Sequence, residues 1–251
     1  MLIQPMNFTQ ILPGLLALTL FQGAAGSVIA EQRLAYTENS PQWLQSVGKL
    51  DVPGIQFEEG QRRHQRESCS GTLVAPVGTR LADIVVTAWH CLEFYRDLSK
   101  PITFTLLPGS DRAIRREAYR LADGGGMYAD WAVLRLSRPV DTGLIPAMEL
   151  NPAQGDRQRP VTMAGFSGDN GLGMDGAVMT YHNDCRITRQ HREGSETDCS
   201  AYKGASGGAV IQLSQQGVAQ LTGVISRGNS EGISIYVPVT RFRRPLDKHL
   251  N

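Results

Sequence analysis

Short apolar runs recur along the chain from residue 44 onward, separated by turn-forming residues. Some of them alternate: in "WAVLRLS", Leu134 and Leu136 lie on one face of an extended chain, and Val133, Arg135 and Ser137 lie on the other. Such alternation is typical of antiparallel strands with one buried face, so the sequence predicts an all-β barrel or sandwich. The runs are "LQSVGKL", "SGTLVAP", "DIVVTAW", "ITFTLL", "WAVLRLS", "VTMAGF", "AVMTYH", "GAVIQLS", "QLTGVIS" and "ISIYVPV".

Two features interrupt this strand pattern. The stretch "NPAQGDRQRP" (151–160) is the best linker candidate and divides the strand-rich region roughly in half. Near the C-terminus, Phe242, Leu246 and Leu250 stand four residues apart, which predicts a short amphipathic helix packed on the body. Pro245 is tolerated if it lies in the first turn of that helix.

Residues 1–30 contain no Asp, Glu, Lys or Arg and combine the apolar run "ILPGLLALTLF" with the small-residue stretch "QGAAGSVIA". This combination predicts a signal peptide, although the usual early Lys or Arg is missing; a buried N-terminal segment is the alternative. Residues 31–45 are polar and turn-rich, as in a leader or pro-segment. No later run is long and apolar enough for an anchor, so we expect a secreted or periplasmic product without stable membrane association.

Composition and charge exclude some classes of function. The 251 residues are 41% hydrophobic and 20% charged, which is enough apolar material for a sizeable core. The net charge is +1, so no overall field attracts nucleic acid. We interpret the basic clusters "QRRHQR", "RAIRREAYR" and "RFRRPLDK" as solvated faces, because acidic residues balance them across the chain.

The four cysteines form one local pair in each half of the chain: Cys69, Cys91, Cys185 and Cys199. Three pairings are possible, and in an exported chain we expect the two local disulfides, Cys69–Cys91 and Cys185–Cys199. The alternative is a zinc site made by His182, Cys185, His191 and Cys199, but their spacing matches no compact zinc pattern. We therefore expect no metal and no organic cofactor.

Three residues carry the chemistry of nucleophilic catalysis. Ser206 stands in "GASGG", where small neighbours permit a sharp turn and let backbone N–H groups approach an oxyanion; a glycine-rich turn is the alternative. His90 ends the strand-like "DIVVTA" and is either a base or a buried structural histidine. Asp130 precedes an apolar strand, where an unpaired carboxylate is unfavourable, although many aspartates simply begin strands. A serine needs such a base, and the base needs an orienting carboxylate.

The motifs "TAWHC", "DWAVLRL" and "GASGGAV", in the order His, Asp, Ser, resemble those of trypsin-like (chymotrypsin-fold) serine proteases. The bacterial secreted branch, which includes the glutamyl-endopeptidase-like enzymes, is the most similar. "CSGTLVAP", "TGVISRG" and "GISIYVPVTRF" match as well, so the resemblance covers about residues 43–250. It implies one protease domain, 46–251, made of two antiparallel six-stranded β-barrels at about 46–150 and 157–251, with the active site between them.

In this resemblance Ser206 is the nucleophile, His90 the general base and then acid, and Asp130 the orienting carboxylate. The backbone N–H groups of Gly204 and Ser206 are implied to form the oxyanion hole. Ala205 is a departure, because animal trypsin-like enzymes have an aspartate there that pairs with a newly cut amino terminus. Ala205 cannot form that ion pair, so the second disulfide or local turns must hold the oxyanion-binding loop.

The resemblance also implies a primary specificity pocket. Ser200 lies near its base, which lacks the aspartate of Lys- and Arg-specific enzymes. Glutamyl-specific relatives have a histidine where this chain has Ile225. We therefore expect a medium-sized or apolar substrate side chain. The residues implied for substrate binding are Ser200, Ala201, Ser226, Arg227 and Gly228, with Ser226 also within reach of Asp130.

We therefore expect a monomeric serine endopeptidase that acts on proteins or peptides through an acyl-enzyme. One alternative is a catalytically inactive, protease-like binding protein. Another is a serine esterase of the α/β-hydrolase type, because "GASGG" also fits G-x-S-x-G. That fold needs an acid and then a histidine after Ser206, and the C-terminal candidates are Glu231, Asp247 and His249.

Overall fold

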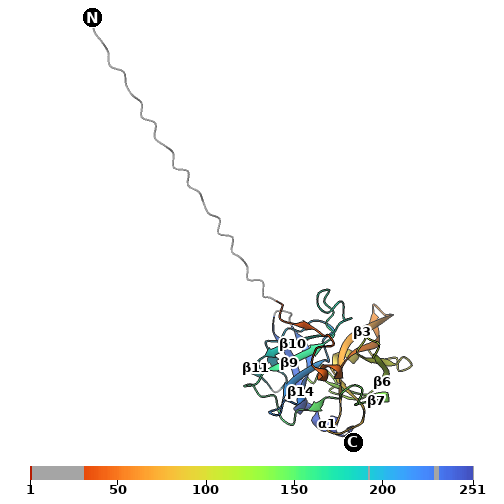
Figure 1. The fold of residues 1–251 in the computed structure, drawn as a ribbon. Coiled ribbons are helices and arrows are strands. Elements are labelled where there is room, and N and C mark those ends of the chain that lie inside the picture. The colour runs from red at the N-terminus through yellow and green to blue at the C-terminus, as the bar shows by residue number, and fades with distance from the viewer. Residues whose placement is uncertain (2–30, 192, 229–231, 251) are drawn as a thin grey trace. The chain divides into compact units, whose positions relative to one another are not determined.

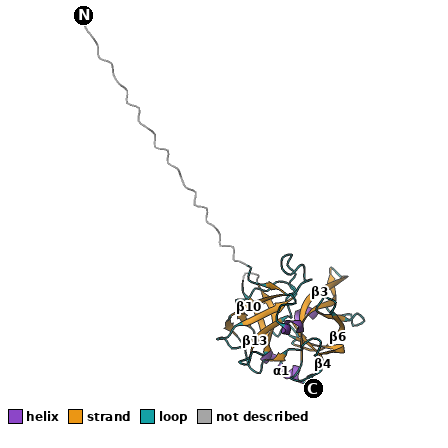
Figure 2. Cartoon of the chain, viewed as in Figure 1, coloured by secondary structure: helices purple, strands orange, loops and turns teal. Residues whose placement is uncertain are grey.

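β-Strands dominate the structure, a computed structural model that describes residues 1, 31–191, 193–228 and 232–250 (Figures 1 and 2). The expected signal peptide, 1–30, lies outside the described residues except for Met1. From Gln32 on, the chain forms one compact unit. None of the helices in the described ranges is long and apolar enough to cross a membrane.

The first half closes into a barrel of six antiparallel strands in the order β2-β3-β4-β7-β6-β5. In β7 the side chains of Leu134 and Leu136 are buried while Arg135 is partly exposed, as the alternation predicts. Val133 is buried as well, because the C-terminal segment covers this part of the outer face and Arg135 Nη2 donates to the His249 carbonyl. The strands are β2 (Val47–Glu58), β3 (Gln61–Val74), β4 (Leu81–Thr87), β5 (Ile102–Leu106), β6 (Ile114–Asp123) and β7 (Ala132–Asp141).

The second half is a curled sheet of nine strands in the order β1-β10-β9-β13-β14-β15-β12-β11, with β8 beside β14. Its strands are β1 (Leu34–Ala35), β8 (Glu149–Leu150), β9 (Val161–Gly165), β10 (Thr180–Cys185), β11 (Ile187–Gln190), β12 (Ser195–Thr197), β13 (Ala209–Leu213), β14 (Ala219–Gly228) and β15 (Ser234–Pro238). Six were expected. The two-residue strands β1 and β8 are additional to those expected. The pairing of β10 with β9 shifts register near Asp184, whose φ is 58°, just before the chain passes from β10 into β11. The predicted all-β class is confirmed.

The C-terminal helix is also confirmed. Helix α1 (Arg243–Asp247) follows η3 (Val239–Arg241), and Pro245 lies in its first turn. Phe242 stacks on Trp131 with 5.6 Å between ring centroids, and Leu246 is fully buried. Because Trp131 belongs to the first half, the C-terminal segment that follows the second sheet packs against the first half. At the other end, η1 (Gln42–Ser46) leads into β2.

Candidate active site

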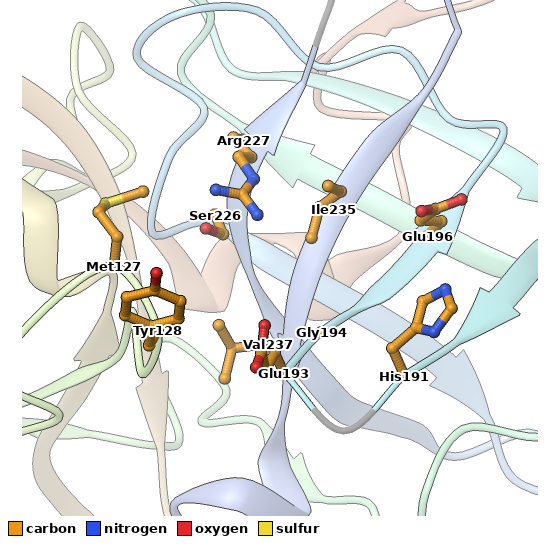
Figure 3. A pocket seen from close by; sticks show the side chains of 10 residues that line it. All are labelled: Met127, Tyr128, His191, Glu193, Gly194, Glu196, Ser226, Arg227, Ile235 and Val237. Carbon is orange, nitrogen blue, oxygen red and sulfur yellow. The ribbon is translucent and has the colours of Figure 1, made fainter.

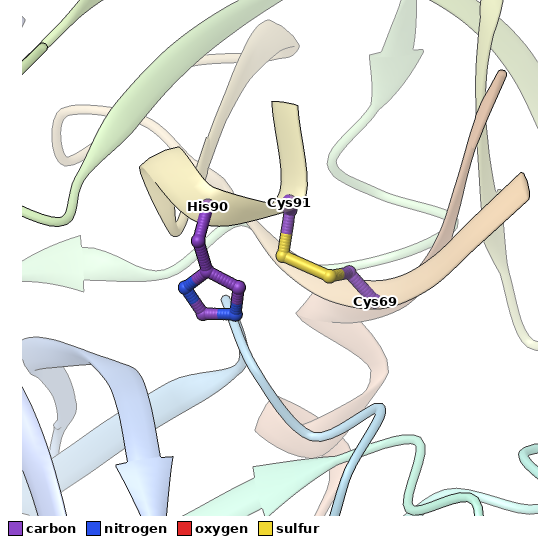
Figure 4. Close-up of side chains that lie close together, drawn as sticks. All are labelled: Cys69, His90 and Cys91. Atoms are coloured by element: carbon purple, nitrogen blue, oxygen red, sulfur yellow. A yellow bond between two sulfur atoms is a disulfide. The ribbon is translucent and has the colours of Figure 1, made fainter. Parts of the chain in front are cut away.

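His90 lies in η2 (Trp89–Leu92), the short 3-10 helix that follows β4. Its neighbour Cys91 forms a disulfide with Cys69 of β3, which ties this turn to the barrel wall (Figure 4). Asp130 accepts two hydrogen bonds from His90, one from Nδ1 at 2.8 Å and one from the backbone N–H at 2.9 Å. The imidazole is 25% exposed, so the ring is held at its Nδ1 edge and accessible elsewhere.

Asp130 is fully buried just before β7. Ser226 of β14 donates its hydroxyl to Oδ2 at 2.5 Å, the same oxygen that faces His90 Nδ1. Burial raises the pKa of Asp130, but the hydrogen bonds from His90 and Ser226 outweigh that effect, and the pKa lies below its usual value. An ionised Asp130 only accepts hydrogen bonds, so the proton of neutral His90 sits on Nδ1 and Nε2 is an acceptor.

Ser206 lies between β12 and β13, in a turn that requires glycine on either side. Gly204 has a φ of 93° and Gly207 a φ of 79°. A Cβ on Gly207 would lie 2.1 Å from Thr87 Oγ1 and 2.2 Å from the Ser70 carbonyl oxygen. Only glycine fits so close to the first barrel. The turn from the second half therefore packs directly on β3 and β4.

Ser70, fully buried on β3, connects the two halves at this point. Its N–H donates to the Ser206 carbonyl at 2.8 Å. Its hydroxyl donates to the Gly204 carbonyl at 2.8 Å and accepts the Phe166 N–H at 2.8 Å. The sequence offers no signal for this role, because a serine in a strand is unremarkable and its partners lie 96 and 134 residues away.

The backbone N–H groups of Gly204 and Ser206 have no acceptor among the described residues. The Lys203 carbonyl accepts the Gly168 N–H at 2.6 Å. Since the C=O and N–H of a trans peptide point in opposite directions, the Gly204 N–H points away from Gly168. Two free N–H groups beside a serine are what an oxyanion needs.

The turns that carry His90 and Ser206 are in contact, since Cys91 Sγ lies 3.8 Å from the Ser206 carbonyl oxygen. The fold thus brings His90, Asp130 and Ser206, from three separate segments, into one site. Within the described part of the chain, Ser206 Oγ makes no hydrogen bond to His90 Nε2. Catalytic hydrogen bonds are often long without substrate and tighten when it binds.

Comparison with known proteins decides the family. Residues 69–219 match the model of the trypsin-like peptidase domain. The chain belongs to the trypsin-like peptidase family. The fold of this peptidase is similar to the crystal structure of the serine endoprotease from Yersinia pestis, with a TM-score of 0.55 and 18% sequence identity. That match covers 83% of this chain and 64% of the other chain, and at this identity it shows the fold alone. No curated protein matches the chain.

In this peptidase, the walls expected for the primary pocket lie close together. A Cβ on Gly228 would lie 2.7 Å from the Ala201 carbonyl oxygen and 2.9 Å from Ser234 Oγ. Ser200 donates its N–H to His182 Nδ1 at 3.0 Å, which fixes the base of this region. The Gly228 backbone therefore packs closely against Ala201, and the cavity that Ser200 and Ala201 line is only about 10 Å³.

Arg227 lines a different space, a groove of about 410 Å³ that Ser226 lines as well (Figure 3). Ser226 is also the hydrogen-bond partner of Asp130, so the groove begins beside the candidate site. The first half contributes Met127 and Tyr128 to it. Glu193, in the turn between β11 and β12, and Glu196, in β12, add two carboxylates to the lining (Figure 3).

The disulfide between Cys185 and Cys199 excludes the alternative of a zinc site at these residues. Cys185 and Cys199 form a disulfide, so their sulfurs are not thiolate ligands. His182 lies beside that disulfide, whereas His191 lines the groove. The two disulfides of the peptidase are the pairs that the sequence predicted.

Proposed function

We propose that this protein is a serine endopeptidase with Ser206 as nucleophile, His90 as general base and then acid, and Asp130 as the orienting carboxylate. One observation carries the proposal: the buried Asp130 accepts hydrogen bonds from His90 Nδ1, the His90 N–H and Ser226 Oγ. A carboxylate held in this way fixes the tautomer of His90. It also stabilises the imidazolium that forms when Ser206 loses its proton.

The geometry supports the following reaction. Ser206 Oγ attacks the carbonyl carbon of the scissile peptide bond while His90 Nε2 takes the hydroxyl proton. The developing oxyanion accepts hydrogen bonds from the N–H groups of Gly204 and Ser206. The imidazolium then gives its proton to the leaving amine, and the acyl group remains as an ester on Ser206. Water, deprotonated by His90, attacks that ester and releases the carboxylic acid.

For substrate binding, we propose that the substrate backbone pairs with β14 at Ser226 and Gly228. The side chain preceding the cleaved bond enters the region beside Ser200 and Ala201, and Arg227 lines the neighbouring groove, not the rim expected from the sequence. The absence of an aspartate or glutamate at Ser200 and Ala201 supports a medium-sized or apolar side chain. We also propose that the protein belongs to the bacterial secreted branch of the family, which includes the glutamyl-endopeptidase-like enzymes.

We propose that the protein is exported to the periplasm or the medium after loss of residues 1–30 and acts there as a monomer without a cofactor. A disulfide in each half supports an oxidising compartment. The domain spans 46–251, with halves at about 46–150 and 157–251. Residues 31–45 form its leader, and part of this leader packs on the body, since β1 pairs with β10 and Leu44 is fully buried.

The two alternatives fare differently. An α/β-hydrolase needs a parallel sheet covered by helices. Among the described residues, the strands pair antiparallel, apart from β8 with β14 and an isolated bridge between Val74 and Met148. The α/β-hydrolase alternative therefore does not fit this fold. A protease-like binding protein shares this fold, and only a measurement of turnover separates it from an enzyme.

That measurement is cleavage of a peptide library by the purified protein and by its Ser206→Ala variant. We expect the wild type to cut after medium-sized or apolar residues. We expect Ser206→Ala to lower kcat by about 10⁶-fold, as when a catalytic serine is removed. The matched control is Ser99→Ala, on an exposed loop, which keeps full activity. A wild type that binds peptides without cutting them, or a Ser206→Ala variant that still cuts, contradicts the proposal.

A further inference from the structure

Arg33 is a buried cation in the N-terminal arm, defined here as residues 32–36. Its side chain is 3% exposed. Nη1 donates to Asp169 Oδ1 at 2.8 Å and Nη2 to Asp169 Oδ2 at 3.2 Å, in a two-pronged ion pair. Its Cζ also lies 3.8 Å from the centre of the Tyr202 ring. Arginine suits this place, because its planar fork matches a carboxylate and its flat face stacks on an aromatic ring.

Asp169 belongs to a turn that is bonded to the turn of the nucleophile. It accepts the Gly173 N–H at 3.4 Å, and its own carbonyl accepts the Asp175 N–H at 3.0 Å. The preceding residue, Gly168, donates its N–H to the Lys203 carbonyl at 2.6 Å. The ion pair is therefore one residue away from the hydrogen bond that orients the peptide between Lys203 and Gly204.

Tyr202, the other partner of Arg33, begins the turn of the nucleophile. Its carbonyl accepts the Ala205 N–H at 3.0 Å, which closes a turn around Lys203 and Gly204. Arg33 thus contacts the segments on both sides of the Gly204 N–H, one through Asp169 and one through the Tyr202 ring. Moving either segment would re-aim that N–H group.

The arm holds Arg33 from both sides. Leu34 pairs with Tyr181 in β10, and the Tyr36 N–H donates to the Met179 carbonyl at 2.8 Å. On the other side, Gln32 Oε1 lies 3.1 Å from His182 Nε2. The strand pairing of the arm and the Gln32 contact therefore fix the position of Arg33 together with its own ion pair.

We infer that Arg33 is a positioning residue: with Asp169 and Tyr202 it clamps the oxyanion-binding turn in its active form, a task that Ala205 cannot perform. This inference rests on the proposed peptidase activity. It also makes the N-terminal arm part of the working enzyme, so cutting the leader beyond residue 33 inactivates it. The clamp contacts Tyr202 and Asp169, the neighbours of Lys203 and of its partner Gly168, so it acts on the oxyanion hole in the transition state and leaves substrate binding on β14 almost unaffected.

The test compares Arg33→Ala, Arg33→Lys and Asp169→Asn with the wild type, each expressed from the full sequence. Removing one oxyanion donor lowers kcat by about 10²–10³-fold, so we expect losses of about 10²-fold in kcat with KM changed less than about twofold. Binding of a peptide boronate, whose hydroxyl occupies the oxyanion hole, should weaken in parallel. The matched control is Arg63→Ala, which removes an exposed ion pair with Glu58 and leaves kcat unchanged.

Urea unfolding measures the stability of each variant. Tyr202→Leu removes the aromatic ring beside Arg33 and keeps the ion pair between Arg33 and Asp169. A double variant, Arg33→Asp with Asp169→Arg, restores part of kcat if the pair itself matters. Unchanged kcat in folded Arg33→Ala overturns the inference while leaving the peptidase proposal intact. So does a loss of activity that only follows the folded fraction. A folded wild type without any peptidase activity overturns both.

Discussion

The two halves of the molecule hold the residues of the proposed active site by different means. In the first half, His90 and Asp130 sit at the ends of strands in a closed barrel, and the Cys69–Cys91 disulfide anchors the histidine turn. In the second half, Ser206 sits on a turn between strands of a sheet. That turn is fixed by groups from elsewhere, among them Ser70 and Gly168.

This difference separates two tasks. In the proposed mechanism the carboxylate needs a constant, buried environment, and Asp130 is fully buried at the edge of the closed barrel, with Ser226 of β14 beside it. The oxyanion donors need the peptide planes of the Ser206 turn to be correctly oriented, which depends on several distant hydrogen bonds. Changes in the first half should therefore act on proton transfer, and changes around the turn should act on both stability and the oxyanion hole.

The largest expected effect in this comparison comes from Asp130→Asn. An amide in place of the carboxylate stabilises the wrong tautomer of His90 and cannot support the imidazolium, so kcat should fall by about 10⁴-fold. The measurement is kcat on a peptide substrate near neutral pH. The boronate affinity of the oxyanion hole should change far less than kcat, and an equal loss in both would argue against the division of tasks.

Ser70→Ala tests the other side of the comparison. It leaves the Gly204 carbonyl and the Phe166 N–H buried without their partner, which should lower the free energy of unfolding by about 3 kcal/mol. Urea unfolding measures this loss. The control Ser110→Ala removes a hydroxyl that donates to the Leu107 carbonyl on an exposed turn, and should stay within about 0.5 kcal/mol of the wild type.

The smallest expected effect is a loss of folding stability at acidic pH. The hydrogen bonds from Arg33 hold the pKa of Asp169 below its usual value, so this carboxyl binds a proton less readily in the folded than in the unfolded chain. Its contribution to stability, about 1 kcal/mol, is complete above the unfolded pKa of about 4 and is lost as the pH falls through the folded pKa. Unfolding of the wild type and Asp169→Asn should therefore differ at neutral pH and converge in acid. A difference that is constant with pH contradicts the ion pair.

Much of this arrangement was predictable from the sequence because its signals are local. His90, Asp130 and Ser206 each lie at the edge of an apolar strand or in a run of small residues. The two cysteine pairs are separated by 22 and 14 residues, and the structure joins both. Alternation of polar and apolar residues likewise reveals strands one at a time.

The supports of the Ser206 turn were not predictable, because they are contacts between distant segments. Arg33 and Asp169 are 136 residues apart, and Arg33 lies in a polar stretch typical of a leader. Ser70 has an ordinary strand environment in sequence. Only the pairing of β1 with β10, and the packing of the Ser206 turn on β3, bring these groups together.

The most direct test of the central claim is mass-spectrometric mapping of the adduct left by a fluorophosphonate, which reacts only with an activated serine. The account predicts one adduct per folded molecule, on the peptide that contains Ser206. It also predicts that labelling is slowed strongly in His90→Ala. An adduct on any other serine, or a folded protein that takes up no label, would contradict it.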